Sequence, residues 1–582
     1  MNRGLTFALA LAVSTVVARP LAAQDVRADS GGIAIGGNVT GSTFNIGVPP
    51  EQLTALVRQS ADLSESQKKL ITKLEGELEL NRRQIRAALD ILGEANVEAE
   101  NLAAKLVEVA ERFKALQATA TTRSGDDSRI AALKAQARQA IESGDLAKAD
   151  ALLADVTTEQ RRTRAEHQRG FAEERRPSAE RRRVLDSLAV DEAENLARRG
   201  DIAMTRLRYR EAAAQFADAA AVFADHGPHW RKRIHYLEKE ANALYRQGDN
   251  FRDNDALGSA AERYRALIAS KPRDRVPLQW ADAQYHLGFT LARLGERESG
   301  TARLEEALAS YAEAQKELTR EAQPFRWATI ESARGSVLGV IGVRERGTAR
   351  LDEAVAAYRE VLKVVKRSRA PVRWAWAQMN LGTALARRGE HDRDARRLES
   401  AVAAHHRALL VFRREKYPFT WALTQTNLGF ALSGLGASGG GTARSLQAIA
   451  AYNEALKEWT RERAPLRWAF AHHGLGNALM RTAVHESGTA RFEQAIATYD
   501  EALKERSRER APIEWALTSG QQGVALMLLA ERSNNAEPAE RAVAQIEASL
   551  DVMRRAGQGP REDYFRRQLT LARALVQRLR QP

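Results

Sequence analysis

The 582-residue chain contains no cysteine. This absence excludes disulfides, zinc sites built on thiolates, cysteine nucleophiles and a lipid-modified N-terminal cysteine. Long apolar runs are also missing after the first 23 residues, so no later segment is predicted to span a bilayer. What remains is a chain rich in Arg, Glu and Ala.

The N-terminus has the organisation of a secretory signal. Arg3 supplies a basic start, and Leu5–Ala18 forms an apolar run of about 14 residues, which is too short for a comfortable membrane span. We expect cleavage after Ala23, with Ala18 as a second candidate site and an uncleaved anchor as the alternative. Residues 1–23 are therefore predicted to be a signal peptide, and the mature chain to be periplasmic or secreted.

The formal net charge is +14. A basic surface can indicate nucleic-acid binding. Export argues against that partner here, and because Arg and Glu alternate throughout, most of the charge is expected to lie on solvated helix faces. No nucleic acid is therefore predicted as a partner.

A Pro-x-x-Trp motif recurs six times at a constant interval. Trp280 and Trp327 lie 47 positions apart, as do Trp468 and Trp515. A fixed period of 20–50 residues indicates a solenoid, propeller or array. The six motifs begin at Pro277, Pro324, Pro371, Pro418, Pro465 and Pro512.

Each unit reads as two helices. Pro277 suits the first turn of a helix, and apolar residues follow at helical spacing until Gly295. A polar loop leads to Thr301, which opens a second helix. Neither helix can bury its apolar face alone, so consecutive units must stack.

Residues within the unit resemble the tetratricopeptide repeat (TPR) family. Leu287-Gly288, followed by Ala307-x-x-x-Tyr311-x-x-Ala314, matches the family signature, and the match recurs from Leu381-Gly382, Leu428-Gly429 and Leu475-Gly476. The unit is longer than the usual repeat of about 34 residues. The long repeats of the kinesin-light-chain type are a closer analogy. The resemblance implies an all-α, TPR-type α-solenoid of antiparallel helix pairs forming a right-handed superhelix.

The remaining segments differ in character. Residues 24–49 are Gly-rich and alternate apolar with small residues, which fits either an edge-pairing β-hairpin or a flexible linker. Residues 50–130 are helical, and a heptad seam within them predicts a coiled coil. Its apolar members are Ile71, Leu74, Leu78, Ile85 and Leu92, with Asn81 and Ala88 at the other d positions.

Further boundaries follow from composition. Residues 131–190 form a charged helical region with a weak repeat-like start, in which Thr158–Arg183 is interpreted as either a patch for an anionic partner or a solvated helix. Residues 191–276 contain degenerate units, residues 277–560 the six Trp-containing repeats, and residues 561–582 a capping helix.

Two enzyme motifs overlap in one loop. Gly436-Ala-Ser438-Gly-Gly440 satisfies G-x-S-x-G, and Gly434, Gly436 and Gly439 satisfy G-x-G-x-x-G. Both need a preceding strand, whereas this loop is predicted between two helices. The adjacent pairs His405-His406 and His472-His473 point about 100° apart on a helix and make no chelate. We therefore predict no catalytic, cofactor-binding or metal-binding residue.

Binding of a protein or peptide in the concave groove is the function that remains, with self-assembly of the chain through its N-terminal region as the alternative. In TPR proteins the first helix of each pair lines the groove. That likeness gives these predicted groove residues: Tyr285, Phe289, Arg293, Trp376, Met379, Asn380, Thr383, Arg387, Asn427, Phe430, Phe470, His473, Asn477 and Arg481. Arg293, Arg387 and Arg481 occupy one equivalent position, where a guanidinium can clamp a carboxylate, so an extended acidic polypeptide is the expected ligand.

The signal interpretation is testable on the mature protein. We expect the chain from the extracytoplasmic fraction to begin at Gln24, because cleavage follows the apolar run. N-terminal sequencing of the fractionated protein measures this. A cytoplasmic chain beginning at Met1 contradicts it.

Overall fold

The structure is a computed structural model that describes residues 50–58, 65–97, 101–119, 128–171, 179–225, 227–271, 273–298, 300–345 and 348–581. The predicted signal peptide and Gly-rich segment lie outside these residues. The described chain forms two compact units, with a boundary inside one helix. The N-terminal unit ends at Ile330, and the C-terminal unit spans Glu331–Pro582.

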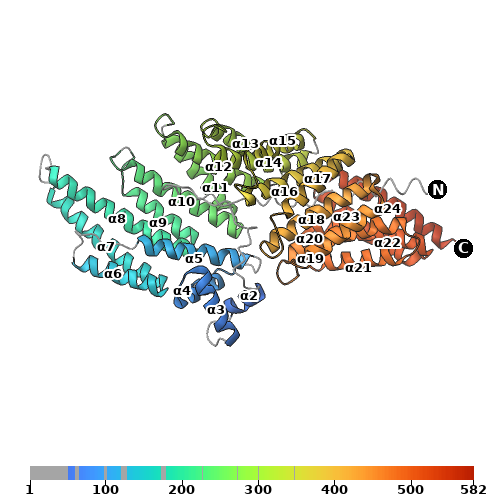
Figure 1. Cartoon of the computed structure of the whole chain (residues 1–582), viewed down its shortest axis with the longest axis horizontal. Coiled ribbons are helices and arrows are strands. Elements are labelled where there is room, and N and C mark those ends of the chain that lie inside the picture. The colour runs from blue at the N-terminus through green and yellow to red at the C-terminus, as the bar shows by residue number, and fades with distance from the viewer. Residues whose placement is uncertain are drawn as a thin grey trace. The chain divides into compact units, whose positions relative to one another are not determined.

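Helices make up the regular structure of the described residues (Figure 1). The first group is α2 (Pro50–Arg58), α3 (Glu65–Leu78), α4 (Arg82–Glu94), α5 (Leu102–Thr119), α6 (Ser128–Ser143) and α7 (Leu146–Phe171). Helix pairs follow: α8 (Ala179–Thr205) with α9 (Tyr209–Ala221), and α10 (Trp230–Phe251) with α11 (Asn254–Ser270).

The six Trp-containing repeats each contribute a first helix, A, and a second helix, B. The A helices are α12 (Pro277–Arg297), α14 (Pro324–Glu345), α16 (Pro371–Asp392), α18 (Pro418–Leu435), α20 (Pro465–His485) and α22 (Pro512–Ser533). The B helices are α13 (Ala302–Gln315), α15 (Thr348–Val364), α17 (Ala395–Leu409), α19 (Gly441–Leu456), α21 (Ala490–Leu503) and α23 (Ala536–Arg555). Helix α24 (Gly559–Arg580) closes the array where a capping helix was predicted. The described pairs form a TPR-like solenoid.

The coiled-coil prediction is wrong. Helix α3 ends at Leu78, Glu79 adopts a positive φ of 51°, and Asn81 caps α4 through a capping box with Gln84. The heptad residues are buried against α2, α5 and α6 of the same unit. Their periodicity therefore reflects an intramolecular core, and Asn81 is a helix cap rather than a seam residue.

Close approach of A to B within a pair depends on one glycine. A Cβ placed on Gly288 would lie 2.7 Å from the Tyr311 ring, and one on Gly476 would lie 2.7 Å from Tyr499. The same contact joins Gly200 to Phe216 in the upstream pair that lacks the Trp. The predicted small-residue and aromatic positions are thus confirmed as the contact between the two helices of a pair.

A second periodic contact lies where the chain enters each A helix, and the sequence analysis missed it. An Arg seven residues before each Trp places its guanidinium over the indole ring, at 4.5 Å for Arg273 on Trp280 and 6.0 Å for Arg461 on Trp468. Such contacts are typical cation–π pairs. The other members are Arg320–Trp327, Arg367–Trp374, Arg414–Trp421 and Arg508–Trp515.

Several of these arginines also form an ion pair with the next repeat. Arg414 lies 2.6 Å from Glu458, and Arg461 lies 2.7 Å from Glu505. Each pair joins the turn before one A helix to the turn before the following A helix. These arginines therefore tie neighbouring repeats together at the N-terminal ends of the A helices.

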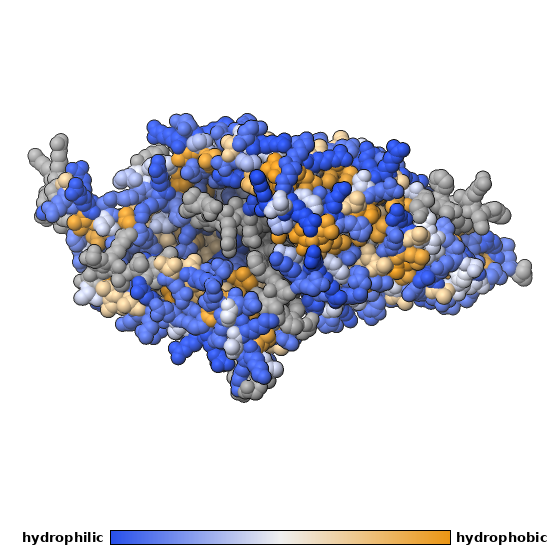
Figure 2. Space-filling view, in the orientation of Figure 1, coloured by the Kyte–Doolittle hydropathy of each residue, from blue (hydrophilic) through white to orange (hydrophobic). Residues whose placement is uncertain are grey.

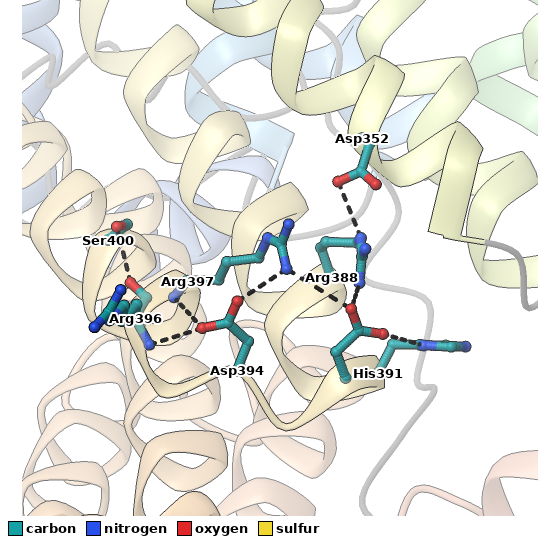
Figure 3. A network of polar contacts seen from close by, with 8 residues as sticks. Asp352, Arg388, His391, Asp394, Arg396, Arg397 and Ser400 are labelled. Atoms are coloured by element: carbon teal, nitrogen blue, oxygen red, sulfur yellow. Dashed lines mark hydrogen bonds and ion pairs between the residues drawn. The ribbon is translucent and has the colours of Figure 1, made fainter.

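Polar contacts order the A–B connection of the third Trp repeat (Figure 3). Arg388 lies 2.9 Å from Asp352 of the preceding repeat and also pairs with Asp392. Asp394 accepts from the backbone N–H of Arg396 and Arg397 and so caps α17. Charges in this connection are satisfied within the chain.

The Arg-rich stretch in α7 is partly neutralised in the same way. Arg161 and Arg164 lie 2.8 Å and 2.9 Å from the two carboxylate oxygens of Glu192 on α8. These two arginines therefore serve packing of α7 against α8. Among the described helices, none combines the length and apolar character that a membrane span requires.

The glycine contact can be tested within the C-terminal unit. Gly476→Ala should destabilise the unit by about 1–3 kcal/mol, because the new methyl group overlaps Tyr499, which is fully buried. Gly339→Ala is the matched control: nothing lies within 4 Å of its Cβ, and alanine favours helix by up to about 1 kcal/mol. Urea unfolding measures both. Equal effects of the two substitutions would contradict the packing role.

Candidate functional site: the inner layer of A helices

The A helices form a continuous layer in the C-terminal unit. Helix α16 contacts α18, α18 contacts α20, and α20 contacts α22 directly, in addition to the B helix within each pair. This layer carries the predicted groove residues from Trp376 to Arg481, and α12 of the N-terminal unit carries the other three. Where each side chain lies in the layer decides whether it can meet a ligand.

In the N-terminal unit the predicted groove residues are already engaged. Arg293 is 8% exposed and lies 3.0 Å from Glu296 and 3.5 Å from Asp249. Burial opposes its charge, but these two carboxylates raise its pKa well above the ordinary value. Phe289 is buried against Tyr245, and Tyr285 is half-buried beside it. Arg293 is therefore already paired with carboxylates of the chain. The arginines at this equivalent position of successive repeats are called the arginine ladder below.

A further arginine belongs to the same ladder. Arg246 lies 47 positions before Arg293, and its guanidinium is 2.7 Å from Glu108 on α5. Glu108 also binds Lys105 and Arg112, and despite its burial these three cations hold its pKa well below the ordinary range. Sequence analysis missed Arg246 because the helix that carries it lacks the Pro-x-x-Trp motif. The 47-residue interval back from Arg293 would have found it.

The third Trp repeat contributes core residues and half-exposed ones. Trp376 and Met379 are buried in an apolar cluster with Phe412 and Trp421, so they pack the layer rather than line its surface. Asn380 and Thr383 are half-buried. The Asn380 side chain is hydrogen-bonded to Tyr358 on α15.

Four further predicted residues lie on the A helices of the third, fourth and fifth repeats. Phe430 and Phe470 are half-buried, and Arg387 stacks its guanidinium 4.4 Å from the Phe430 ring centroid. Asn427 is 8% exposed, and its amide forms no hydrogen bond to any described residue. These side chains lie on neighbouring A helices of the layer.

His473 and Asn477 belong to a buried hydrogen-bond chain. The Asn477 amide accepts from the Tyr499 hydroxyl at 2.6 Å and contacts His473 Nε2 at 3.1 Å. His473 Nδ1 lies 3.2 Å from the Thr518 hydroxyl, which accepts from Arg506 at 2.8 Å. The amide of Asn477 therefore faces inward and is committed to its own repeat.

Arg481 differs from Arg246 and Arg293. It is 8% exposed, and no carboxylate of the described residues lies within 4.0 Å of it. Burial lowers its pKa from the ordinary value. Of the four arginines at this position, Arg246 and Arg293 pair with carboxylates of the chain and Arg387 stacks on Phe430, whereas Arg481 has no carboxylate of the described residues within 4.0 Å.

Ser438, the residue of the G-x-S-x-G pattern, lies in a π-helical turn, Gly436–Gly440, between α18 and α19. Its hydroxyl donates to the Gly434 carbonyl oxygen at 3.0 Å. A nucleophile elbow needs a strand before the serine, and here a helix precedes it. Over the described ranges, no three His, Asp or Glu side chains are placed to hold a metal ion.

His405 replaces the tyrosine that packs on glycine in other repeats. Its ring lies 2.8 Å from the site of a Cβ on Gly382, in the slot that Tyr358 and Tyr452 fill in the adjacent repeats. Neither ring nitrogen has a hydrogen-bond partner. Burial lowers the pKa of His405 to about 3, and His406 contributes.

Comparisons with known proteins give similarity of structure alone. No family model and no curated protein matches the chain. A Rap protein complexed with competence and sporulation factor is 10% identical, covering 67% of this chain and 100% of its own, with a TM-score of 0.38. Yeast Tom70 is 15% identical, covering 91% and 96%, with a TM-score of 0.34. A STAND protein with a TPR sensor from Pyrococcus horikoshii is 14% identical, covering 90% and 72%, at 0.37. These values assign no family.

Replacing the buried histidine should alter stability in acid. The unfolded chain binds a proton at His405 near pH 6.5, whereas the folded chain binds it only near pH 3, so stability is lost as pH falls through this window. His405→Tyr removes that loss, and the advantage over wild type should grow by up to ~3–4 kcal/mol between pH 7 and pH 3. Urea unfolding at each pH measures it. Parallel stability curves for the two proteins would contradict the assignment.

Proposed function

We propose that the chain is a TPR-like scaffold that binds an extended polypeptide on the A-helix layer of its C-terminal unit. The observation that carries the proposal is Asn427, whose amide lies in the layer without a hydrogen bond to any described residue. An amide donates and accepts one hydrogen bond each with a peptide backbone, so it suits an extended chain.

Apolar contacts support the same surface. Phe430 follows Asn427 on α18, and Phe470 lies on α20; both rings are half-buried. In the space-filling view apolar residues gather over α16, α18 and α20 among hydrophilic ones (Figure 2). Partly exposed aromatic rings beside polar groups are the usual anchors of peptide binding.

The charge of the surface favours an acidic ligand. Arg387 and Arg481 both lie within electrostatic reach of the Glu390 carboxylate. Cations near a binding surface orient an acidic partner. Arg293 takes no part in this proposal, because Asp249 and Glu296 already neutralise it.

The proposal includes export and a non-enzymatic role, both from the sequence. The alternative, self-assembly through the N-terminal region, has lost its main argument, since Ile71, Leu74 and Leu92 are buried in their own unit. Polypeptide binding is therefore the function that the described residues favour.

Peptide selection on the purified chain tests the scaffold. Peptides chosen from a random 12-residue display library should bind the wild-type chain, and Asn427→Ala should weaken them about tenfold, which is the loss of one or two hydrogen bonds. Leu410→Ala is the control, because Leu410 is 48% exposed after α17 and outside the A layer. Fluorescence anisotropy measures each affinity. Selected peptides that bind both variants equally would refute the surface.

A further inference from the structure

The net charge of the C-terminal unit is concentrated in one kind of connection. The four segments that lead from a B helix into the next A helix contain thirteen Lys and Arg against five Asp and Glu, and so carry +8 of the chain's formal +14. The four connections from A to B contain one Arg against one Asp and one Glu. The basic segments are residues 365–370, 410–417, 457–464 and 504–511.

These basic connections end in the same backbone turn. In each, the residue four before the Trp donates its N–H to the carbonyl oxygen four residues earlier, at 2.9 Å for Ala370 on Lys366. Because consecutive A helices contact one another directly, the turns follow one another along the N-terminal ends of the A helices, here called the basic edge. A cation precedes the N–H donor in all four turns: Arg369, Lys416, Arg463 and Arg510.

Much of the basic edge is not neutralised by the chain. Arg463 lies 3.2 Å from Glu458, and Arg508 lies 3.3 Å from Asp551. Other cations of the edge are exposed and have no carboxylate of the described residues within 4.0 Å: Lys366, Arg367, Arg369, Arg413, Lys416 and Arg510. These six charges are open to an anionic partner.

Apolar side chains lie exposed at the same edge. Leu466 follows Pro465 at the start of α20 and is 57% exposed, the highest value among the large apolar side chains of the described residues. Leu410, in the connection after α17, is 48% exposed. Val372 and Ile513 stand equivalent to Leu466 in their repeats and are half-buried. Exposed apolar residues spread over separate connections give no continuous apolar core of the kind that protein interfaces use.

Separate apolar side chains among unpaired cations are typical of a surface that lies on an anionic bilayer. The cations meet the lipid phosphates, and the apolar groups enter the boundary between headgroups and acyl chains. Trp374 and Trp515, which are half-buried in the first turns of α16 and α22, also suit that boundary. An acidic polypeptide would use the cations but would leave Leu466 without a role.

We propose that the basic edge of the C-terminal unit docks on the surface of an anionic phospholipid bilayer. The contact is peripheral, since none of the described helices has the length and apolar character of a membrane span. It goes beyond the binding of a polypeptide and uses another part of the unit. Asn427 lies nine residues after the start of α18, roughly 14 Å along the helix from the basic edge.

Vesicle sedimentation of the purified full chain tests the docking. Vesicles with about 30% phosphatidylglycerol in phosphatidylcholine should bind the wild type through its cations. Raising sodium chloride from about 0.1 M to about 0.5 M should release it, because salt screens those charges. Vesicles of phosphatidylcholine alone measure any binding through the apolar run Leu5–Ala18, which every variant shares.

A charge-matched pair of triple variants locates the contact. Joint replacement of Arg369, Lys416 and Arg510 by Gln should lower the partition coefficient roughly a hundredfold, at about fivefold per cation. The control replaces three cations at the opposite ends of the B helices by Gln and should change it less than about threefold, because roughly 20 Å, or two Debye lengths, separates them from the edge. The control residues are Arg396, Arg444 and Arg541.

An apolar pair separates a bilayer from an acidic polypeptide. Leu466→Ser should weaken vesicle binding about tenfold, because the side chain no longer enters the acyl boundary. Leu446→Ser, on α19 and 46% exposed in the wild type, should leave it unchanged. Poly-L-glutamate at the same concentration of negative charge should bind the wild type more weakly than the vesicles do, and Leu466→Ser should not alter that binding.

The outcomes decide the proposal. Equal binding of the wild type to anionic and neutral vesicles, or unchanged binding of the edge triple variant, overturns bilayer docking. Tighter binding of poly-L-glutamate, with no effect of Leu466→Ser on vesicles, assigns the edge to an acidic polypeptide and overturns it as well. Peptides that depend on Asn427 should bind the edge triple variant as they bind the wild type, so each proposal can fail without the other.

Discussion

Contact between a glycine on the A helix and a side chain on its B helix, aromatic in the first five Trp-containing repeats and Ile546 in the sixth, sets the geometry of the array. Because a Cβ at Gly288 or Gly476 would lie 2.7 Å from the ring, inside ordinary van der Waals contact, the two helices come closer than larger side chains allow. The ring then fills the space between repeats, and the A helices can touch one another. Trp280, Trp421 and Trp468 are buried in the resulting stack.

The repeat architecture could be predicted from the sequence because its signals are local and periodic. Pro277 and its five equivalents start helices, and Leu-Gly pairs mark the tight contacts. The coiled-coil prediction was wrong for a physical reason. A seam such as Ile71, Leu78 and Ile85 records only that one helix face is buried, and it does not say against which chain.

For the candidate site, the sequence could predict only which residues occupy equivalent positions in successive repeats. Helical spacing placed Arg293 and Arg481 at equivalent positions, but their different environments depend on residues from distant segments. Glu108 reaches Arg246 across 138 positions, and Glu390 approaches Arg481 from two A helices away. Burial of Trp376 and the inward hydrogen bond of Asn477 likewise arise from packing, which the groove pattern of a family does not encode.

The Arg–Trp ties have an elastic consequence for the C-terminal unit. They join consecutive turns at the N-terminal ends of the A helices, as Arg414–Glu458 and Arg461–Glu505 do. Arg388–Asp352 and the contact of Arg532 with the Glu486 carbonyl oxygen join consecutive repeats at the opposite ends of the A helices, so neighbouring repeats are held along both edges. Arg387 and Arg481 lie thirteen residues beyond their Trp, near those opposite ends. Any bending of the unit that changes the spacing of Arg387 and Arg481 must therefore strain contacts on both edges of the helix stack.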